Sequence, residues 1–247
     1  MNKTFAGKVA LVTGGSRGIG AAIAKRLAAD GAAVAITYAS SPEKADEVVR
    51  AIESADGRAL AIRADSADAE AIRSAVGQTV ETLGRLDVLV NNAGIAIIEP
   101  LDQFSLADLD RMMAVNIRAV FIAVQEASRH MVEGGRIITI GSVNGDRMPF
   151  AGGSVYAMTK AAVAGLTRGL AHDLGPRGIT VNTVQPGPVN TDLNPSEGAF
   201  AESMKGMMAL GRYGRVDEIA GLVAYLASPE AAFITGSSVT IDGGFNA

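Results

Sequence analysis

The stretch "SVYAMTK", Ser154 to Lys160, contains a phenol at Tyr156 and a primary amine at Lys160. A separation of four residues places both side chains on one face of a helix. A phenol ordinarily loses its proton at a pH of about 10, and a lysine ammonium at about 10.4. An acid beside a base is the equipment that proton transfer requires. What the pair serves has to be sought in the rest of the chain.

Two further polar residues occupy unusual positions. Ser142 closes the apolar run "GRIITIGS" (135–142), and Asn116 interrupts a helical pattern in "AVNIRAVF" (114–121). Asn is a poor residue for a helix interior, because its side chain competes for backbone hydrogen bonds. We therefore expect either the side chain or a displaced main-chain carbonyl at Asn116 to have another function.

A glycine-rich turn, "TGGSRGIG" (13–20), follows the first apolar run and opens a helical pattern. Such a turn brings free amides at a helix N-terminus close to a pyrophosphate. The spacing differs from G-x-G-x-x-G, and a turn that merely joins strand to helix is the alternative. The context favours a dinucleotide site, and the residues predicted to bind it are Gly14, Ser16, Arg17, Gly18, Ile19 and Gly20.

The type of dinucleotide is indicated at the end of the second strand, which reads Tyr38-Ala39-Ser40 and carries no acid. An acid there would hold the ribose 2′-hydroxyl of NAD(H) and repel a 2′-phosphate. Arg17 can pair with a phosphate, although it can equally be a solvated surface residue. NADP(H) is therefore predicted over NAD(H). Asp65 ends the third strand and Ser66 follows it. Asp65 either accepts from the adenine amino group or caps the next helix.

These residues sit within a regular alternation of strands and helices. Strands are predicted at 8–13, 33–37, 58–65, 86–94, 135–142, 178–187 and 236–244, and helices at 19–30, 42–55, 67–83, 105–131, 154–174, 197–209 and 216–227. Several strands are apolar on both faces, which predicts an α/β fold with a seven-stranded parallel, doubly wound sheet covered by helices on both faces. Ligands bind such sheets at the carboxyl ends of the strands.

The composition excludes several other classes. The 247 residues are 48% hydrophobic and carry a net charge of −4, without the basic surface that nucleic acid requires. With no cysteine and only two histidines, disulfides and an ordinary zinc site are excluded and no metal is predicted. No apolar run reaches the roughly 20 residues of a membrane span, and the N-terminus reads as a first strand rather than a signal peptide. We expect a cytoplasmic protein.

The least regular segment, 194–214, is rich in Gly and Met and follows the sixth strand at the ligand edge. It predicts a mobile substrate lid around 190–214, with a loosely packed surface excursion as the alternative. Met204, Met207 and Met208, together with Ile95, Asn144 and Phe150, are predicted to shape the substrate pocket. Ordinary core filling is the alternative for the three methionines.

The motifs "TGGSRGIG", "NNAG" (91–94), Asn116, Ser142, Tyr156-x-x-x-Lys160 and "PGPVNTD" (186–192) occur in the order and approximate spacing of one family. Over essentially its whole length the chain resembles the short-chain dehydrogenase/reductases. The resemblance implies one Rossmann-type catalytic domain over 1–247 and a catalytic tetrad of Asn116, Ser142, Tyr156 and Lys160.

The implied mechanism is hydride transfer between the nicotinamide and a carbonyl or alcohol carbon. Lys160 and the oxidised nicotinamide would lower the pKa of Tyr156 from about 10 to about 7. Such a shift needs about 4 kcal/mol of stabilisation of the phenolate relative to the phenol. Tyr156 would then exchange a proton with the substrate oxygen, to which Ser142 also hydrogen-bonds. Lys160 would hold the nicotinamide ribose, and Asn116 would hold a water that connects Lys160 with solvent.

The resemblance also implies further contacts with the cofactor. Residues 91–94 border the adenosine and ribose path through Asn92, Ala93 and Gly94, and the nicotinamide carboxamide contacts Pro186, Gly187, Val189 and Thr191. A simple strand stop at Pro186-Gly187 and a helix cap at Thr191-Asp192 are the alternatives. A homotetramer built through the helices 105–131 and 154–174 is implied as well.

The chain looks closest to 3-oxoacyl-acyl-carrier-protein reductases, on the segments "GRIITIGS", "RGITVN" and "ASPEAAFITGSSVTIDGG". Glu133 departs from the basic residue that those reductases place before the fifth strand, whereas Arg177 keeps a second basic position. The predicted substrate is therefore a 3-oxoacyl thioester or a small ketone or aldehyde.

Two other functions are alternatives to the reduction of a carbonyl. "GSVNGDRMP" (141–149) and "VQPGPVNTDLNP" (184–195) resemble cyclic-di-GMP-binding family members that mediate biofilm dispersal, so a regulatory protein is the alternative function. A structural or scaffold protein would leave the tetrad and the glycine turn without a purpose.

Overall fold

The computed structural model describes residues 3–247, so the first two residues of the predicted 1–247 domain lie outside the described range. Seven strands form one sheet in the order β3-β2-β1-β4-β5-β6-β7, and every neighbouring pair is parallel. This confirms the predicted doubly wound α/β fold. The strands are β1 (Val9–Val12), β2 (Ala33–Tyr38), β3 (Arg58–Arg63), β4 (Val88–Asn91), β5 (Arg136–Ile140), β6 (Thr180–Pro186) and β7 (Ser238–Ile241).

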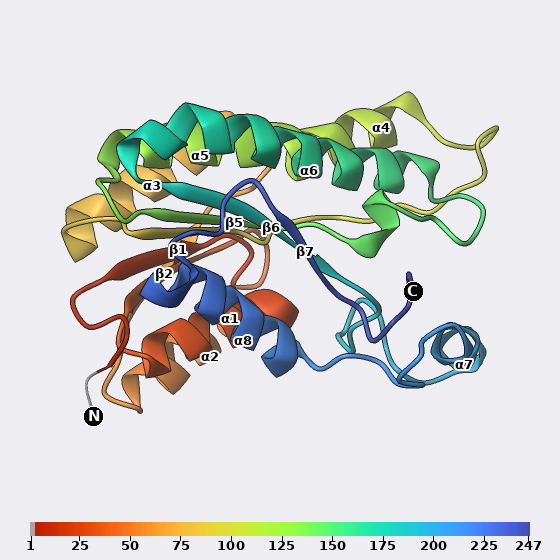
Figure 1. The fold of residues 1–247 in the computed structure, drawn as a ribbon, viewed down its shortest axis with the longest axis horizontal. Coiled ribbons are helices and arrows are strands. Elements are labelled where there is room, and N and C mark those ends of the chain that lie inside the picture. Colours follow the sequence, from red (N-terminus) through yellow and green to blue (C-terminus); the bar gives the residue numbers. More distant parts are fainter. Residues whose placement is uncertain (1–2) are drawn as a thin grey trace.

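Helices cover both faces of the sheet (Figure 1). On one face α1, α2 and α8 pack against side chains such as Ala10, Val34 and Ile138. On the other face α3, α5 and α6 pack against Leu11 and Leu89. The helices are α1 (Gly18–Ala29), α2 (Pro42–Glu53), α3 (Ala69–Leu83), α4 (Leu106–Met113), α5 (Ala119–His130), α6 (Ser154–Leu174), α7 (Ala199–Gly206) and α8 (Val216–Ala227).

The four central strands β1, β4, β5 and β6 are buried along their whole length, which explains their continuous apolar character. The chain winds outward from β1 in both directions, so the connections after β1 and β4 diverge from each other. This divergence opens a crevice at the carboxyl ends of these strands, where open α/β sheets bind ligands.

The helix predicted over 105–131 differs from the expectation in an informative way. It begins at Leu106 and ends at His130, but a π-helical turn over Ala114–Arg118 separates α4 from α5. Asn116 lies inside this turn. π-helical turns widen the backbone hydrogen-bonding pattern and are frequent at functional sites. The sequence therefore marked the irregularity correctly, although it did not show that the helix changes its winding there.

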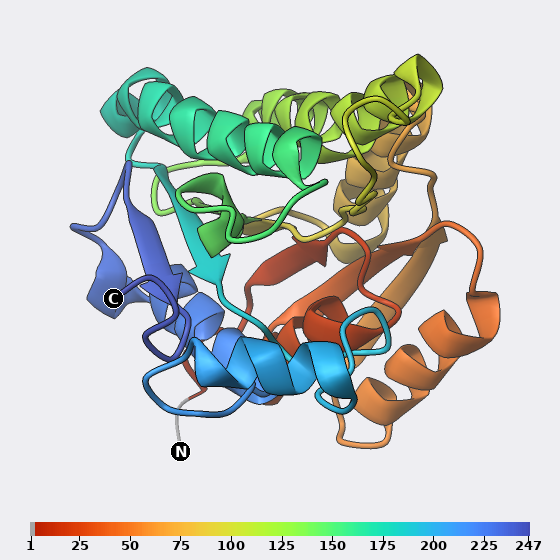
Figure 2. The ribbon, with the colours of Figure 1, turned by 90° about the vertical axis from the view of Figure 1, so that its right-hand side faces the viewer.

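The chain leaves the layered body after β6 and returns at α8. Figure 2 shows this excursion, with α7 in front of the carboxyl edge of the sheet. A separate apolar cluster lies beneath it and includes Val143, Met204 and Phe245. Across residues 3–247, none of the helices combines the length and the apolar character needed to cross a membrane.

Candidate active site

A cavity of about 980 Å³ lies at the carboxyl edge of the sheet. Its volume is at the upper end of the range for ligand pockets, which suits a large ligand together with a small one. Every residue predicted to bind the cofactor lines it: Gly14, Ser16, Arg17, Gly18, Ile19, Gly20, Tyr38, Ala39, Ser40, Asp65, Ser66, Asn92, Ala93, Gly94, Tyr156, Lys160, Pro186, Gly187, Val189 and Thr191.

The glycine turn leaves no room for side chains on its inner side. Gly14 has a φ of +63°, a left-handed conformation that favours glycine. A Cβ atom at Gly20 would lie 2.4 Å from both the Asn92 amide nitrogen and the Gly14 carbonyl oxygen. The first backbone bond that closes α1 runs from Ala21 N to Arg17 O, so the earlier amides lie at the open N-terminus of the helix. This arrangement fits a pyrophosphate.

Hydrogen bonds tie the glycine turn to the loop that follows β4. The Asn92 amide nitrogen donates to Thr13 O at 3.0 Å and to Gly14 O at 2.9 Å. The Thr13 hydroxyl accepts from the backbone nitrogens of Asn92 and Ala93 at 3.0 and 3.1 Å. On the other side, the Gly14 amide donates to the Thr37 hydroxyl at 3.0 Å. These bonds fix the backbone that lines one half of the cavity.

At the far end of this half, Tyr38, Ala39 and Ser40 line the cavity where β2 ends. Asp65 also lines it, and one of its carboxylate oxygens accepts from Ala67 N at 2.9 Å. The alternative that Asp65 caps the next helix is wrong, because the N-cap of α3 is Asp68, which accepts from Glu70 N and Ala71 N. Asp65 therefore stabilises its own turn and faces the cavity.

Three members of the predicted tetrad meet in the cavity wall. Ser142 follows β5, while Tyr156 and Lys160 lie one turn apart on α6. The Ser142 hydroxyl accepts from Asn144 N at 3.1 Å and lies near the Tyr156 phenol, whose pKa it lowers. The Lys160 ammonium donates to Ile140 O at 3.0 Å and lies 5.7 Å from the centre of the Tyr156 ring. The remaining N–H donors of the ammonium are available to a ligand.

Burial dominates the electrostatics of this pair. It raises the pKa of Tyr156 above its ordinary value, and the Ser142 hydroxyl opposes the rise. It also lowers the pKa of Lys160 from 10.5 to about 8. The protein's own groups therefore shift the Tyr156 pKa in the direction opposite to the one predicted for Lys160 and the oxidised nicotinamide together. Removal from water is the largest cause of both shifts.

Asn116 is the tetrad member that does not line the cavity, because its side chain turns toward the loop after β4. Its oxygen accepts from Ile95 N at 2.9 Å, while its nitrogen donates to Ile95 O at 2.8 Å and to the Thr159 hydroxyl at 3.1 Å. Asn116 thus connects this loop to α6. The function expected for the Asn116 side chain is therefore to hold the loop after β4 against α6.

The other half of the cavity is apolar. Ile95, Asn144, Phe150 and Met204 line it as predicted. Met204 and Met208 are buried in the apolar cluster beneath α7, which confirms the alternative of core filling for these two residues. Met204 also lines the cavity. Met207 packs only partly buried against that cluster. Lining residues that sequence reasoning missed are Ile98, Phe200, Tyr213 and Phe245.

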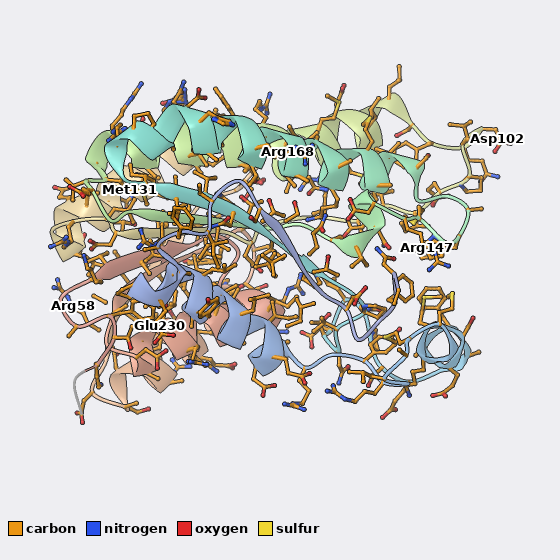
Figure 3. All side chains as sticks on the ribbon, in the orientation of Figure 1. Arg58, Asp102, Met131, Arg147, Arg168 and Glu230 are labelled. Atoms are coloured by element: carbon orange, nitrogen blue, oxygen red, sulfur yellow. The ribbon has the colours of Figure 1, made fainter. Side chains whose placement is uncertain are left out.

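Phe245 comes from the C-terminal tail, which nothing in the local sequence connects with the site. Its carbonyl oxygen accepts from Arg147 at 2.9 Å, and the Arg147 guanidinium lies 6.0 Å from its ring centre. Figure 3 shows Arg147 at the end of the molecule that holds α7 and the C-terminus. The Asn246 side chain donates to Val143 O at 3.3 Å. The tail is therefore fastened to the segment directly after Ser142.

The structure places Thr191 and Asp192 in the segment between β6 and α7. A helix cap at Thr191-Asp192 is wrong, since α7 begins at Ala199 after the N-cap Gly198. Thr191 lines the cavity, and Asp192 forms an ion pair with Lys44 at 2.8 Å. Nothing in the sequence pointed to Lys44. Among the described residues no group of three or more His, Cys, Asp or Glu side chains is arranged to hold a metal ion.

Comparison with known proteins gives consistent matches along the chain. The family model described as enoyl-(acyl carrier protein) reductase matches residues 14–246. The "cyclic-di-GMP-binding biofilm dispersal mediator protein" of Escherichia coli K12 is 50% identical over 243 residues, covering 98% of this chain and 99% of its own. The 3-oxoacyl-(acyl-carrier-protein) reductase of Synechocystis sp. is 42% identical over 240 residues, covering 96% of each chain.

A solved structure extends these matches to three dimensions. A short chain dehydrogenase from Burkholderia cenocepacia J2315, crystallised in complex with NADP, is 56% identical and superposes with a TM-score of 0.98. The match covers 99% of this chain and 100% of the other. The glycine turn, the cavity and the Tyr156–Lys160 pair thus belong to a protein whose whole fold matches a nucleotide-bound dehydrogenase.

Proposed function

The chain belongs to the short-chain dehydrogenase/reductase family and is an NAD(P)-dependent oxidoreductase, and from this premise we propose that it reduces a ketone or aldehyde to an alcohol with NADPH. The observation that carries the proposal is the meeting of Ser142, Tyr156 and Lys160 in the wall of the cavity, where the polar half adjoins the apolar half. A reacting carbonyl at this boundary contacts the acid and the cofactor together.

The polar half of the cavity fits the cofactor. The cradle around Gly20 admits no side chain, the N-terminus of α1 is open to a pyrophosphate, and Lys160 retains donors for ribose hydroxyls. When bound there, NADPH supplies the hydride. NADP(H) is favoured by Arg17 at the rim and by the absence of an acid from Tyr38-Ala39-Ser40, and the similar dehydrogenase holds NADP.

The raised pKa of Tyr156 suits a reductase in one respect. A phenol that keeps its proton at neutral pH can donate it to the carbonyl oxygen as the alcohol forms. The Ser142 hydroxyl donates a second hydrogen bond to the same oxygen and orients the carbonyl for attack. Lys160 supplies a positive charge beside the phenolate that remains, which stabilises it after proton transfer.

We assign Asn116 the placing of the loop after β4. Both of its amide hydrogens are used on Ile95 O and Thr159, which leaves only part of its oxygen for the water that was expected. We propose a main-chain carbonyl of the π-helical turn as the partner for that water. The water would restore the proton of Tyr156 through Lys160.

A free apolar ketone or aldehyde is our preferred substrate. Ile98, Phe150 and Phe200 give the second half of the cavity an apolar lining. Arg177, the basic position considered for carrier-protein docking, donates to Ser128 O and Met131 O at the end of α5, so its charge serves the helix terminus. A 3-oxoacyl thioester remains the main competing substrate, on the identity with the Synechocystis reductase.

The experiment is NADPH consumption by the purified chain across a panel of aryl and alkyl ketones, aldehydes and a 3-oxoacyl thioester. Faster turnover of free ketones than of the thioester supports the preferred substrate. Turnover of the thioester alone moves the assignment to fatty-acid reduction. Consumption with no member of the panel, in a chain that binds NADPH, counts against the reductase.

The relative from Escherichia coli favours a second function, regulation by binding cyclic di-GMP. Titration calorimetry with cyclic di-GMP and with NADPH separates the two. Tight binding of cyclic di-GMP that persists in Tyr156→Phe supports the regulatory function. NADPH binding without measurable cyclic-di-GMP binding supports the reductase alone.

The assembly and the lid belong to the same proposal. Leu106, Met113, Phe121 and Met158 are exposed apolar side chains on α4, α5 and α6, the helices expected to build a homotetramer. Light scattering after size-exclusion chromatography gives the subunit number, and a monomer contradicts the tetramer. Segment 190–214 is the proposed lid, and a cytoplasmic location stays a prediction.

A further inference from the structure

An ion pair joins two segments that lie far apart in the sequence. The Lys44 ammonium, in the first turn of α2, lies 2.8 Å from a carboxylate oxygen of Asp192, 148 residues later. Asp192 lies between β6 and α7, in residues 191–194, which we call the strap. Thr191 and Asn194 exchange two backbone hydrogen bonds, so the strap is a closed turn.

The strap lies over the phosphate-binding turn. A Cβ atom at Gly18, the first residue of α1, would be only 3.5 Å from the Thr191 side chain. Thr191, Asp192 and Leu193 all line the cavity. Figure 2 shows the loop before α7 reaching across the carboxyl edge of the sheet toward α1 and α2. The Lys44–Asp192 pair therefore holds a piece of the proposed lid across the polar half of the cavity.

The charges at this point are unbalanced. The Lys44 hydrogen bond and, to a lesser degree, the charge of Arg17 hold the pKa of the Asp192 carboxyl below its usual value. One carboxylate is thus influenced by two cations. Arg17 and Asp192 line the cavity, as do Tyr38 and Ser40, and Lys44 is joined to it through its bond with Asp192. The end of β2 carries no acid, and the acid that pairs with Lys44 comes from the strap.

The ion pair is exposed, with 46% of the Lys44 side chain and 62% of the Asp192 side chain accessible to solvent. Exposed pairs of this kind contribute little to stability. A phosphate carries more negative charge than a carboxylate and offers three acceptor oxygens, so it competes well for both cations.

We propose that Lys44 and Asp192 form a clasp that a ribose 2′-phosphate opens, taking Lys44 and Arg17 from Asp192 and releasing the strap. Lys44 is then a determinant of NADPH preference and Asp192 its internal competitor. The clasp couples recognition of the 2′-phosphate to the lid, because the chain runs from the strap through residues 195–198 into α7. The inference rests on the proposed use of NADPH.

The test compares two probes, adenosine 2′,5′-bisphosphate and adenosine 5′-monophosphate, by calorimetry with the full chain. Lys44→Gln should weaken the bisphosphate about tenfold, as loss of one charge-assisted hydrogen bond predicts. Asp192→Asn should raise the affinity for the bisphosphate about threefold, because the ligand then no longer has to break an exposed ion pair. The monophosphate should change less than twofold in both variants. Lys205→Gln is the matched control, since Lys205 forms an exposed pair with Glu202 on α7, at 2.7 Å.

Hydrogen–deuterium exchange reads the strap itself. In the unaltered chain, the bisphosphate should raise the exchange rate at residues 191–194, and the monophosphate should leave it unchanged. In Asp192→Asn these residues should exchange rapidly even without a ligand. The clasp is overturned if Lys44→Gln leaves the bisphosphate affinity unchanged, or if the bisphosphate leaves the exchange rate at residues 191–194 unchanged. Failure of the unaltered chain to bind NADPH at all is a different result, which overturns the proposed function.

Discussion

Hydrogen bonds between loops fix the backbone in the polar half of the cavity, which is the proposed cofactor half. Apolar side chains from separate segments line the apolar half, which is the proposed substrate half. Asn92 and Thr13 alone make four bonds across the glycine turn and the loop after β4. On the opposite side Phe200, Tyr213 and Phe245 come from α7, the segment after it and the C-terminal tail. The Phe150 and Phe200 rings meet edge to face at 5.9 Å.

The difference follows from what each half has to hold. A cofactor that is the same in every turnover is served by a preorganised polar cradle, in which backbone amides are already in position. Apolar contacts are non-directional, so the substrate half can adapt to differently shaped ligands. Binding of cofactor and handling of substrate should therefore be separable by mutation.

Tyr156→Phe should give the largest effect and the cleanest separation. The substitution keeps the ring of Tyr156 in the cavity wall and removes only the hydroxyl that supplies the proton, so NADPH affinity should stay within twofold of the original. Turnover should fall about 10²- to 10⁴-fold, the usual contribution of a general acid. Steady-state kinetics and a fluorescence titration with NADPH measure the two quantities. Tyr213→Phe, in the same cavity, is the control. Turnover that survives in Tyr156→Phe would remove the tyrosine from the mechanism.

A substitution of Lys160 measures how much stability the folded protein loses by burying an ammonium group between the two halves of the cavity. Its pKa in the folded protein is about 8, below the ordinary 10.5, so between these values the unfolded chain binds more protons than the folded one. The free energy of unfolding therefore rises with pH in this window. Relative to Lys160→Met, the cofactor-free chain should gain about 2 kcal/mol from pH 7.5 to 9.5.

Urea unfolding of both proteins at the two pH values measures this gain. The raised pKa of Tyr156 acts in the opposite direction, but only above a pH of about 10. A difference between the proteins that is independent of pH would mean that the ammonium is not desolvated in the folded state.

The contrast between the halves also explains what the sequence revealed. The sheet was predictable because β1, β4, β5 and β6 are buried on both faces and read as continuous apolar runs. The lining of the polar half was predictable because many of its residues are clustered at single strand ends, such as 13–20 and 91–94. Short-range motifs of this kind carry their geometry with them.

The substrate half left no such signal. Phe245 reaches the cavity only because Arg147 and Val143 hold the C-terminal tail, and both contacts join residues about a hundred positions apart. Lys44 and Asp192 are equally remote from each other in the sequence. The direction of the Tyr156 pKa shift was missed for a related reason, since burial depends on the completed fold.

Asn92→Ala should damage the cofactor half and spare the substrate half. It removes two side-chain bonds and leaves the Thr13 and Gly14 carbonyl oxygens short of a partner. The free energy of unfolding should fall by about 1.5 kcal/mol, and NADPH should bind about tenfold more weakly. The ranking of ketones by kcat/KM should not change. Gln78→Ala, which removes one exposed bond to Ser74 on α3, is the control. Altered substrate ranking in Asn92→Ala would show that the halves are not independent.

Phe200→Leu should give the smallest effect and the converse pattern. The substitution keeps an apolar side chain on α7 but loses the edge-to-face contact with Phe150, which is equivalent to about 0.5–1.5 kcal/mol. Because Phe200 is more than half exposed, we expect the lower end, about a threefold rise in KM for aryl ketones, with NADPH affinity unchanged. Phe233→Leu is the matched control, since Phe233 is fully exposed and lies outside the cavity wall. A Phe200→Leu variant that loses NADPH affinity instead would place α7 over the cofactor, and the apolar half would no longer belong to the substrate alone.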